Sequence, residues 1–335
     1  MMRSGSLLIG LLCVLSFAVV QADEPIVIKF SHVVAADTPK GKAAERFAEL
    51  AKEKTDGRVE VTVYPNSTLY KDKEEVEALQ LGAVQMLAPS LAKFGPLGVK
   101  EFEVFDLPFI FDGYDQLHTV TEGPIGDELL GMLSDKGVLG LAFWDNGFKV
   151  MSANKPLQEP KDFRGQKMRI QSSKVLDEQM RALGASPQVM AFSEVYQALQ
   201  TGVVDGTENP PSNLYTQKMH EVQKYVTKSD HGYLGYAVIV NKAFWDGLPP
   251  DIRTALEEAM AEATVYANEI AKQDNEDALA AVKESGKSEI IELTPEQKAE
   301  WMKRLAKVHR EMEDRVGKEL IQSIYQATGN DMGKL

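Results

Sequence analysis

The hydrophobic positions in the first third of the chain change period, from that of a strand to that of a helix and back. Residues 26–30 (IVIKF) form a short apolar run that is typical of a strand. Four apolar residues follow at the i, i+3, i+4, i+7 spacing of one buried helix face: Ala44, Phe47, Ala48 and Ala51. After the turn-forming pair Asp56-Gly57, residues 59–64 (VEVTVY) alternate, which predicts a second strand.

The same order continues in the next stretch of the chain. Residues 74–81 have a helical pattern that stops at Gly82, and residues 84–88 predict another strand. Strands that alternate with helices in this way predict a mostly parallel sheet covered by helices, and therefore an α/β fold. Because 335 residues exceed what one hydrophobic core usually holds, we expect two lobes.

A short internal repeat supports two lobes of similar construction. Residues 78–84 (ALQLGAV) match residues 198–204 (ALQTGVV) at five of seven positions, and each copy predicts a helix end, a glycine cap and a strand. Ser90 and Asn209 lie just beyond the two strands. Because open α/β sheets bind ligands outside the carboxyl ends of their strands, both side chains are expected at one shared cleft. So short a match could also arise by chance.

The last third of the chain is predicted to be helical. Residues 251–284 contain neither glycine nor proline, which predicts one helix spanning both lobes or a helix with an undetected break. Residues 294–297 (TPEQ) form a capping box with proline at the first helical position. The helix that they open should turn Trp301, Leu305 and Val308 inward. Charged residues of these helices are expected to form solvated faces.

The first 22 residues have the pattern of a Sec-type signal peptide. Arg3 supplies the positive charge, residues 7–20 are almost continuously apolar, and residues 20–22 (VQA) fit a cleavage site. The apolar run is short for a membrane span, although an uncleaved anchor is the alternative. We expect secretion and cleavage after Ala22.

Cysteine usage points to the same compartment. The single cysteine, Cys13, lies inside the signal segment, so the mature chain would contain none. Disulfides, thiol nucleophiles and thiolate metal ligands are then excluded. Secretion without disulfides fits a bacterial periplasm.

Charge and motifs exclude several classes of function. The formal net charge is −13 and no basic run is present, so nucleic-acid binding is not expected. The sequence lacks the motifs of serine hydrolases, zinc proteases, phosphate-binding loops and dinucleotide-binding turns. Its five histidines have no metal-ligating spacing, so neither a metal nor a cofactor is expected. A periplasmic hydrolase that uses scattered carboxylates is the enzymatic alternative.

One region combines cations with an amide near predicted strand ends. In residues 167–173 (KMRIQSS), alternation separates Arg169 from its two apolar neighbours. Lys149 and Asn209 have similar places after strands. Arg169 could form a surface ion pair, Lys149 could be solvated, and Asn209 could only shape a turn. The other interpretation is a site for a small anion, because a guanidinium binds carboxylates through two parallel hydrogen bonds.

Four runs, taken together, are specific to one family. They are SHVVAADTPKGKAAERFAE near the N-terminus, WDNGFKVMSANKP, DFRGQKMRIQSS and MAFSEVYQALQTGVVDGTENP. On these runs the chain resembles the solute-binding proteins of tripartite ATP-independent periplasmic (TRAP) transporters, in particular their DctP-type C4-dicarboxylate-binding branch. The resemblance covers essentially the whole mature chain.

The resemblance implies a two-lobe periplasmic binding protein of a type II-like fold, with a hinge and a long helix that braces both lobes. It also implies that each lobe is discontinuous in sequence. Lobe I would contain residues 23–146 and 235–275, and lobe II would contain residues 147–234 and 276–335. The ligand would lie between the lobes.

The resemblance also implies roles for individual residues. Arg169 matches the arginine that clamps the ligand carboxylate, and Asn209 matches the amide that orients the ligand and Arg169. Lys149 stands where many relatives have arginine, so its charge is kept but the guanidinium fork is lost. Phe192, which on pattern alone would belong to the core, matches an aromatic wall. The contacts expected from lobe I and from regions nearby are His32, Ser90, Lys93, Lys40 and Tyr233.

This set of residues favours a small dicarboxylate such as succinate, malate or fumarate, with one carboxylate bound by each lobe. The alternatives are a monocarboxylate or 2-oxo acid as the ligand, and a sensory protein that reports to a receptor. The family implies small and large membrane subunits of a transporter as partners. Nothing in the sequence indicates an obligate dimer, so a monomer is expected.

Overall fold

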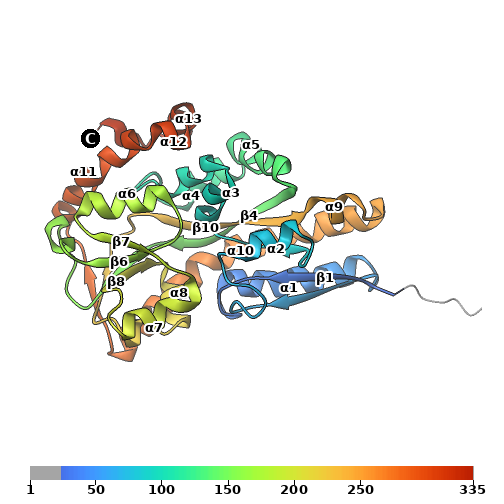
Figure 1. Cartoon of the computed structure of the whole chain (residues 1–335), viewed down its shortest axis with the longest axis horizontal. Helices are drawn as coiled ribbons and strands as arrows, with labels where there is room; N and C mark the ends of the chain where they lie inside the picture. Colours follow the sequence, from blue (N-terminus) through green and yellow to red (C-terminus); the bar gives the residue numbers. More distant parts are fainter. Residues whose placement is uncertain (1–23, 335) are drawn as a thin grey trace, which may run out of the picture.

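The computed structural model describes residues 24–334, so the expected signal segment, residues 1–22, lies outside the described residues. The chain folds into two sheets with helices packed around them, and the two-lobe α/β prediction is confirmed (Figure 1). We call the first sheet and its helices lobe I, and the second sheet and its helices lobe II.

The sheet of lobe I has five strands in the order β2-β1-β3-β10-β4. Their bounds are β1 (Ile26–Ser31), β2 (Val59–Tyr64), β3 (Met86–Leu87), β4 (Val138–Phe148) and β10 (Tyr233–Asn241). β1 pairs in parallel with β2 and β3, whereas β10 runs antiparallel to both β3 and β4. The expected strand at residues 84–88 is therefore only two residues long, and an isolated bridge between Ser90 and Tyr236 continues its pairing.

The sheet of lobe II has six strands in the order β11-β9-β5-β8-β6-β7. Their bounds are β5 (Val150–Ala153), β6 (Lys167–Ile170), β7 (Ser186–Val189), β8 (Gly206–Asn209), β9 (Tyr225–Lys228) and β11 (Glu289–Glu292). Only β5 runs antiparallel to its neighbours, β8 and β9. The mostly parallel sheets that the sequence predicts are thus each interrupted by the strand that follows a crossing between lobes.

The chain crosses between the sheets three times, the last time between β10 and β11. It leaves lobe I at Lys149, between β4 and β5, and returns between β9 and β10. The exact lobe boundaries expected from the sequence stay a prediction, because the C-terminal helices contact segments assigned to both lobes. α12 (Glu313–Val316) and α13 (Lys318–Thr328), for example, pack against the segment between β3 and β4.

The long helix expected at residues 251–284 is a single helix, α10 (Pro250–Ser285), of 36 residues. It packs against β4 and α1 (Pro39–Lys54) of lobe I and against α8 (Pro211–Thr216) of lobe II. Figure 1 shows it passing behind both sheets, in orange. Small side chains form much of its buried face, including Ala259, Ala263, Ala267 and Ala271, so the neighbouring elements approach it closely.

The internal repeat corresponds to matching local structures. α2 (Glu75–Gln80) leads to Gly82 and β3, while α7 (Val195–Gln200) leads to Gly202 and β8. The two glycines have φ values of 76° and 73°, in the left-handed region that only glycine adopts readily. Each lobe therefore uses the same helix–glycine–strand unit to bring its strand to the interlobe cleft.

The remaining helices pack around the two sheets. They are α3 (Phe94–Leu97), α4 (Tyr114–Thr121), α5 (Pro124–Gly131), α6 (Lys174–Leu183), α9 (Lys242–Asp246) and α11 (Pro295–Glu311). The predicted capping box at Thr294 is present, and Trp301, Leu305 and Val308 are fully buried as expected. No helix within residues 24–334 is both long and apolar enough to span a bilayer.

Candidate functional site

The cleft between the lobes is lined by residues from both sheets. The residues that line it are Val33, Val34, Lys40, Asp72, Glu75, Ser90, Lys93, Arg169, Gln171, Phe192, Asn209, Asn213, Leu234 and Tyr236. The space between these side chains is ≈ 20 Å³, which is about the room that one water molecule needs. The lobes are thus closely apposed, and a ligand can enter only when they part.

Arg169 lies on β6, where strand alternation and burial separate its side chain from those of Met168 and Ile170 in the hydrophobic core. It is only 2% exposed, and its Nε and Nη2 atoms donate hydrogen bonds of 3.1 and 2.8 Å to the carbonyl oxygen of Met190. Burial lowers the pKa of Arg169, and the nearby charges of Asp72 and Glu208 oppose this shift. One edge of the guanidinium is thus fixed to the backbone while the group lines the cleft.

Two further lobe II residues lie beside this guanidinium. The ring of Phe192 is 5.7 Å from the Arg169 Cζ atom, within the range of a cation–π interaction. Asn209 ends β8, and its Nδ2 atom makes only long contacts, 3.4 Å to Thr207 Oγ1 and 3.6 Å to Met219 Sδ. Because these contacts are weak, the Asn209 amide can hydrogen-bond to another group in the cleft.

Lobe I contributes Lys93 and Asp72. Lys93 Nζ lies 2.6 Å from Asp72 Oδ2, and both side chains are at most 7% exposed. Burial would raise the pKa of Asp72, but the charge of Lys93 and its hydrogen bond hold that pKa below its usual value. Asp72 Oδ1 also accepts a 3.3 Å hydrogen bond from the Phe192 backbone N–H. Asp72 therefore joins the two lobes at the cleft.

Lys40 and Glu75 are two further ionisable residues of lobe I that line the cleft. Lys40 Nζ donates a 2.8 Å hydrogen bond to the Ala88 carbonyl and lies 3.8 Å from the centre of the Tyr236 ring. Burial lowers the pKa of Lys40 to about 7 and raises the pKa of Glu75 to about 7, since both side chains are nearly inaccessible to water. Burial in the cleft thus favours the neutral form of each group.

Two polar residues from opposite lobes also meet in the cleft. The hydroxyl of Ser90, on lobe I, donates a hydrogen bond to Gln171 Oε1, on lobe II. Ser90 and Asn209, the two residues that follow the repeated unit, line the same cleft as the repeat predicts.

Three residues of the expected site do not line the cleft. Lys149 directs its Nζ atom to Glu208 Oε1 at 2.8 Å, because a buried ammonium requires a nearby carboxylate. The hydroxyl of Tyr233 donates a 2.6 Å hydrogen bond to Asp145 Oδ1. His32 is fully buried, and burial together with the charge of Lys40 lowers its pKa to about 3, which keeps it neutral.

The sequence reasoning missed five polar residues that line the cleft: Asp72, Glu75, Gln171, Asn213 and Tyr236. Gln171 could have been found, because it follows Arg169 by two residues in an extended segment and so shares its face. Asp72 and Glu75 carried no signal, since the sequence contains 50 acidic residues and acidic groups are usually solvated.

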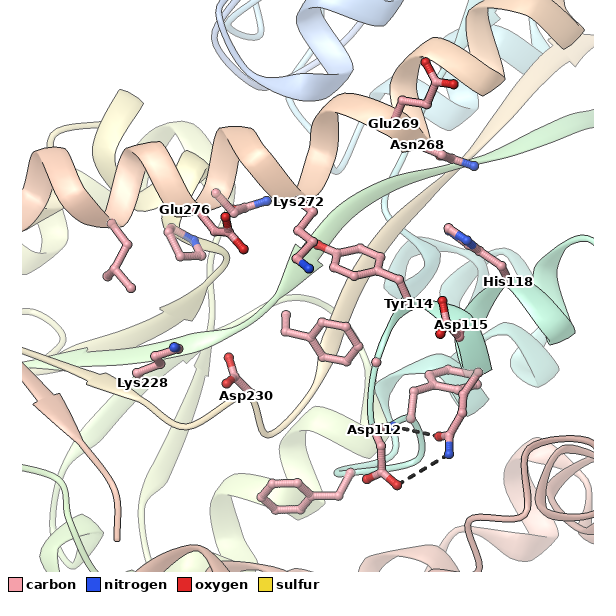
Figure 2. A pocket seen from close by; sticks show the side chains of 18 of the residues that line it. Asp112, Tyr114, Asp115, His118, Lys228, Asp230, Asn268, Glu269, Lys272 and Glu276 are labelled. Atoms are coloured by element: carbon pink, nitrogen blue, oxygen red, sulfur yellow. Dashed lines mark hydrogen bonds between the residues drawn. The ribbon is translucent and has the colours of Figure 1, made fainter. Parts of the chain in front are cut away.

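A larger groove lies beside the middle of α10, next to the connections from β4 to β5 and from β9 to β10. It has a volume of ≈ 780 Å³. Figure 2 shows Lys272 and Glu276 of α10 on one side, and on another Tyr114, the first residue of α4, with Asp112 from the segment before it. Its walls mix charges of both signs, and none of the residues expected at the site lines it. The interlobe cleft, which gathers three buried cations, is therefore the candidate for binding an anion.

Within residues 24–334, no three His, Cys, Asp or Glu side chains are grouped so that they could hold a metal ion. The cleft instead presents guanidinium, ammonium, amide and hydroxyl groups, together with two aromatic rings and the carboxyl groups of Asp72 and Glu75. The guanidinium, ammonium, amide and hydroxyl groups hydrogen-bond to carboxylates, and the guanidinium and ammonium groups also neutralise them.

Residues 30–315 match the family model described as bacterial extracellular solute-binding protein, family 7. The chain belongs to this family. The resemblance deduced from the four sequence runs is thereby confirmed, and the family is one of solute-binding transport proteins rather than of enzymes.

Curated and solved members of the family agree with this assignment. The chain is 69% identical over 314 residues to the C4-dicarboxylate-binding periplasmic protein DctP of Rhodobacter capsulatus, covering 94% of each chain. A TRAP periplasmic solute-binding protein from Shewanella oneidensis, solved with bound succinate, has a TM-score of 0.89 and 42% identity, over 91% of this chain and 99% of that one. A Pseudomonas aeruginosa member with bound L-malate has a TM-score of 0.84 and 44% identity, over 86% and 100%.

Proposed function

We propose that this protein is the periplasmic solute-binding protein of a TRAP transporter. It captures a C4-dicarboxylate, such as succinate, malate or fumarate, between its lobes and delivers it to the small and large membrane subunits. The observation that carries this proposal is the two-sided arrangement of cations in the cleft. Arg169 stands on lobe II, and Lys40 and Lys93 stand on lobe I.

This arrangement suits a ligand with a carboxylate at each end. Burying a dianion is costly unless each charge is paired. Arg169 and Asn209 would bind one carboxylate from lobe II, against the ring of Phe192. Ser90, Lys93 and Lys40 would bind the other from lobe I. The names of the Rhodobacter relative and of the succinate and malate complexes support the same class of ligand.

Ligand binding would drive closure of the cleft. A dianion that touches both lobes stabilises the closed state more than the open state, and this difference in affinity is what shifts the equilibrium. A monocarboxylate would engage the Arg169 side and leave the lobe I cations without a ligand charge. The closed surface would then be recognised by the membrane subunits.

The three expected residues outside the cleft would act indirectly. Lys149 neutralises Glu208, the neighbour of Asn209 on β8, while Tyr233 holds Asp145 on β4. His32 packs as a neutral group near Lys40. These side chains would position the groups that contact the ligand rather than contact it themselves.

A thermal-shift screen tests the proposed ligand class. Succinate, malate, fumarate, 2-oxoglutarate, pyruvate and sialic acid are compared at equal concentration, because a tight ligand raises the unfolding temperature by mass action. We expect the C4-dicarboxylates to give the largest shifts and to be recovered chemically unchanged. Shifts with pyruvate or sialic acid alone would contradict the dicarboxylate assignment, and ligand turnover would favour an enzyme.

We also propose that the mature protein is a periplasmic monomer that begins after Ala22. Mass spectrometry of protein released from the periplasm tests the cleavage site, and light scattering tests the oligomeric state. A retained apolar segment would favour the membrane-anchor alternative instead.

A further inference from the structure

Glu75 has a place that is unusual for a carboxylate. It is the first residue of α2 and lines the cleft where anionic ligands are proposed to bind. It is 1% exposed, and its Oε2 atom has no hydrogen-bond partner within residues 24–334. A buried polar atom without a partner is costly, so a native structure retains one where it has a use.

The other carboxylate of the cleft, that of Asp72, already has hydrogen-bond partners. Asp72 accepts hydrogen bonds from Lys93 Nζ at 2.6 Å and from the Phe192 backbone at 3.3 Å. Burial would raise its pKa, but the charge of Lys93 holds that pKa below the usual value, so Asp72 is ionised in the free protein. Glu75 is therefore the acidic group of the cleft that can change its charge.

The charge balance of the cleft favours such a change. When Lys40 is protonated, Arg169, Lys40 and Lys93 carry three positive charges, and Asp72 and Glu75 can carry two negative ones. A bound dianion would then leave one negative charge without compensation in a buried site. If Glu75 is neutral, the positive and negative charges are equal in number.

The groups that face Glu75 come from four elements. Lys40 approaches from α1, Lys93 from the 3₁₀ turn Leu91–Lys93, Tyr236 from β10, and Asp72 from the segment before α2. Burial raises the pKa of Glu75 to about 7, while the charges of Lys40 and Lys93 oppose the shift and that of Asp72 adds to it. The negative charge of a ligand dianion in the same cleft would also raise the pKa of Glu75, as the charge of Asp72 does.

We propose that Glu75 is a ligand-binding residue that enters the complex as a neutral carboxylic acid. Its Oε2–H then donates a hydrogen bond to an oxygen of the ligand, and capture of one dicarboxylate dianion takes up one proton from solution. This inference rests on the proposed function, since it requires that a dianion binds in this cleft. A carboxylic acid is a donor that an ionised carboxylate cannot replace.

Proton uptake makes the affinity depend on pH in a defined direction. Below pH of about 7, Glu75 is already protonated in the free protein, so affinity should be flat. Above this pH the free protein must take up a proton to bind, and affinity should fall by up to about tenfold per pH unit. Ordinary carboxyl groups titrate far below this window.

Isothermal titration calorimetry with succinate at pH 8, in buffers of different ionisation enthalpy, counts the protons directly. We expect wild type to take up close to one proton per ligand. Glu75→Gln should still bind, because the amide N–H can replace the donor, but with proton uptake near zero. Glu77→Gln is the matched control, because it removes an exposed carboxylate from the same helix and should behave as wild type.

Two outcomes would overturn this inference but leave the proposed function intact. They are binding by wild type without proton uptake, and a Glu75→Gln variant that still takes up a proton. The second outcome would assign the proton to another group, with Lys40 the nearest cation that titrates in this range. Absence of binding by every dicarboxylate would overturn the proposed function as well. If Glu75→Gln fails to fold, a flat wild-type affinity between pH 6 and 9 would still overturn the inference, since it is incompatible with proton uptake.

Discussion

Lys149 and Glu208 form an ion pair inside lobe II, with Lys149 Nζ 2.8 Å from Glu208 Oε1 and both side chains at most 3% exposed. The second carboxylate oxygen of Glu208 accepts a 3.0 Å hydrogen bond from Gln179 Nε2 and lies 2.8 Å from His231 Nε2. This cluster sits beside Asn209, the next residue on β8. The buried charge of Glu208 is thus fully paired, and the pair fixes the strand that presents Asn209.

Removing one member of this pair should destabilise the protein strongly. We expect Lys149→Met to lower the free energy of unfolding by about 3–5 kcal/mol, because it leaves the Glu208 charge buried without its main partner. Urea unfolding of the ligand-free protein measures this. The double variant Lys149→Met/Glu208→Gln should recover part of the loss.

The control for this variant is Lys161→Met, which breaks the exposed pair with Glu159. Exposed pairs contribute about 0–1 kcal/mol, so its unfolding curve should stay close to that of wild type. If Lys149→Met were as stable as this control but bound succinate much more weakly, Lys149 would be a ligand contact, as first expected, rather than a structural cation.

The same cluster predicts sensitivity to acid. Burial would raise the pKa of Glu208, but the charge of Lys149 and the hydrogen bonds from His231 and Lys149 hold it well below its usual value of 4.5. A carboxyl with a lowered folded-state pKa contributes stability above its unfolded pKa and loses it as the pH falls toward the folded value. The stability difference between wild type and Glu208→Gln should therefore be constant from pH 7 to 5 and shrink below about pH 4.5. Urea unfolding at pH 7, 5, 4 and 3 checks this, and a difference that grows on acidification would contradict it.

Arg169→Lys should preserve the fold but weaken binding. Lysine keeps the charge, yet it lacks the planar group that can bind the Met190 carbonyl with one edge while it binds a carboxylate with another. Loss of one charged hydrogen bond corresponds to about 1.5–3 kcal/mol, or roughly 10- to 150-fold in the dissociation constant for succinate. Calorimetry measures the change. Arg164→Lys, an exposed substitution three residues before β6, is the control, and equal affinities of both variants would remove Arg169 from the site.

The lobe II half of the cleft was predictable because it follows from local patterns. Strand alternation separated Arg169 from the core, and the repeated helix–glycine–strand unit brought Ser90 and Asn209 together. Such features depend on residues that are neighbours in sequence. The single helix α10 was predictable for the same reason, since 34 residues without glycine or proline lie within it.

The lobe I half of the cleft was harder to predict, because its charged residues come together only when the chain folds. Glu75 and Asp72 look like solvated acids in sequence, and only the packing of α1, α2 and β10 buries them beside Lys40 and Lys93. The place of Lys149 outside the cleft was equally hard to predict. Its place after a strand suggested a ligand contact, but its partner Glu208 is 59 residues away in sequence. Long-range pairing of this kind leaves no local pattern.

A chain of hydrogen bonds links the cleft to α10 through the crossing segment. The hydroxyl of Tyr236, which lines the cleft, accepts a 2.7 Å hydrogen bond from Asn146 Nδ2, and Asn146 Oδ1 accepts one of 2.8 Å from Ser212 Oγ. Asn275 of α10 completes the network. Its Nδ2 donates to the Asn146 carbonyl at 2.7 Å, and its Oδ1 accepts from the Ser212 backbone at 2.9 Å.

Asn275→Ala should therefore affect both stability and ligand affinity. The substitution removes the Asn275 partner of the buried Asn146 carbonyl, near the end of β4, and of the buried Ser212 N–H, on α8, which costs about 1–3 kcal/mol in unfolding free energy. Because the network reaches Tyr236, we also expect several-fold weaker binding of succinate. Urea unfolding and calorimetry measure the two effects. The control is Gln273→Ala, which removes an exposed amide from the same helix and should change neither quantity. If both variants unfold at the same urea concentration and bind equally well, the network does not connect the hinge to the cleft.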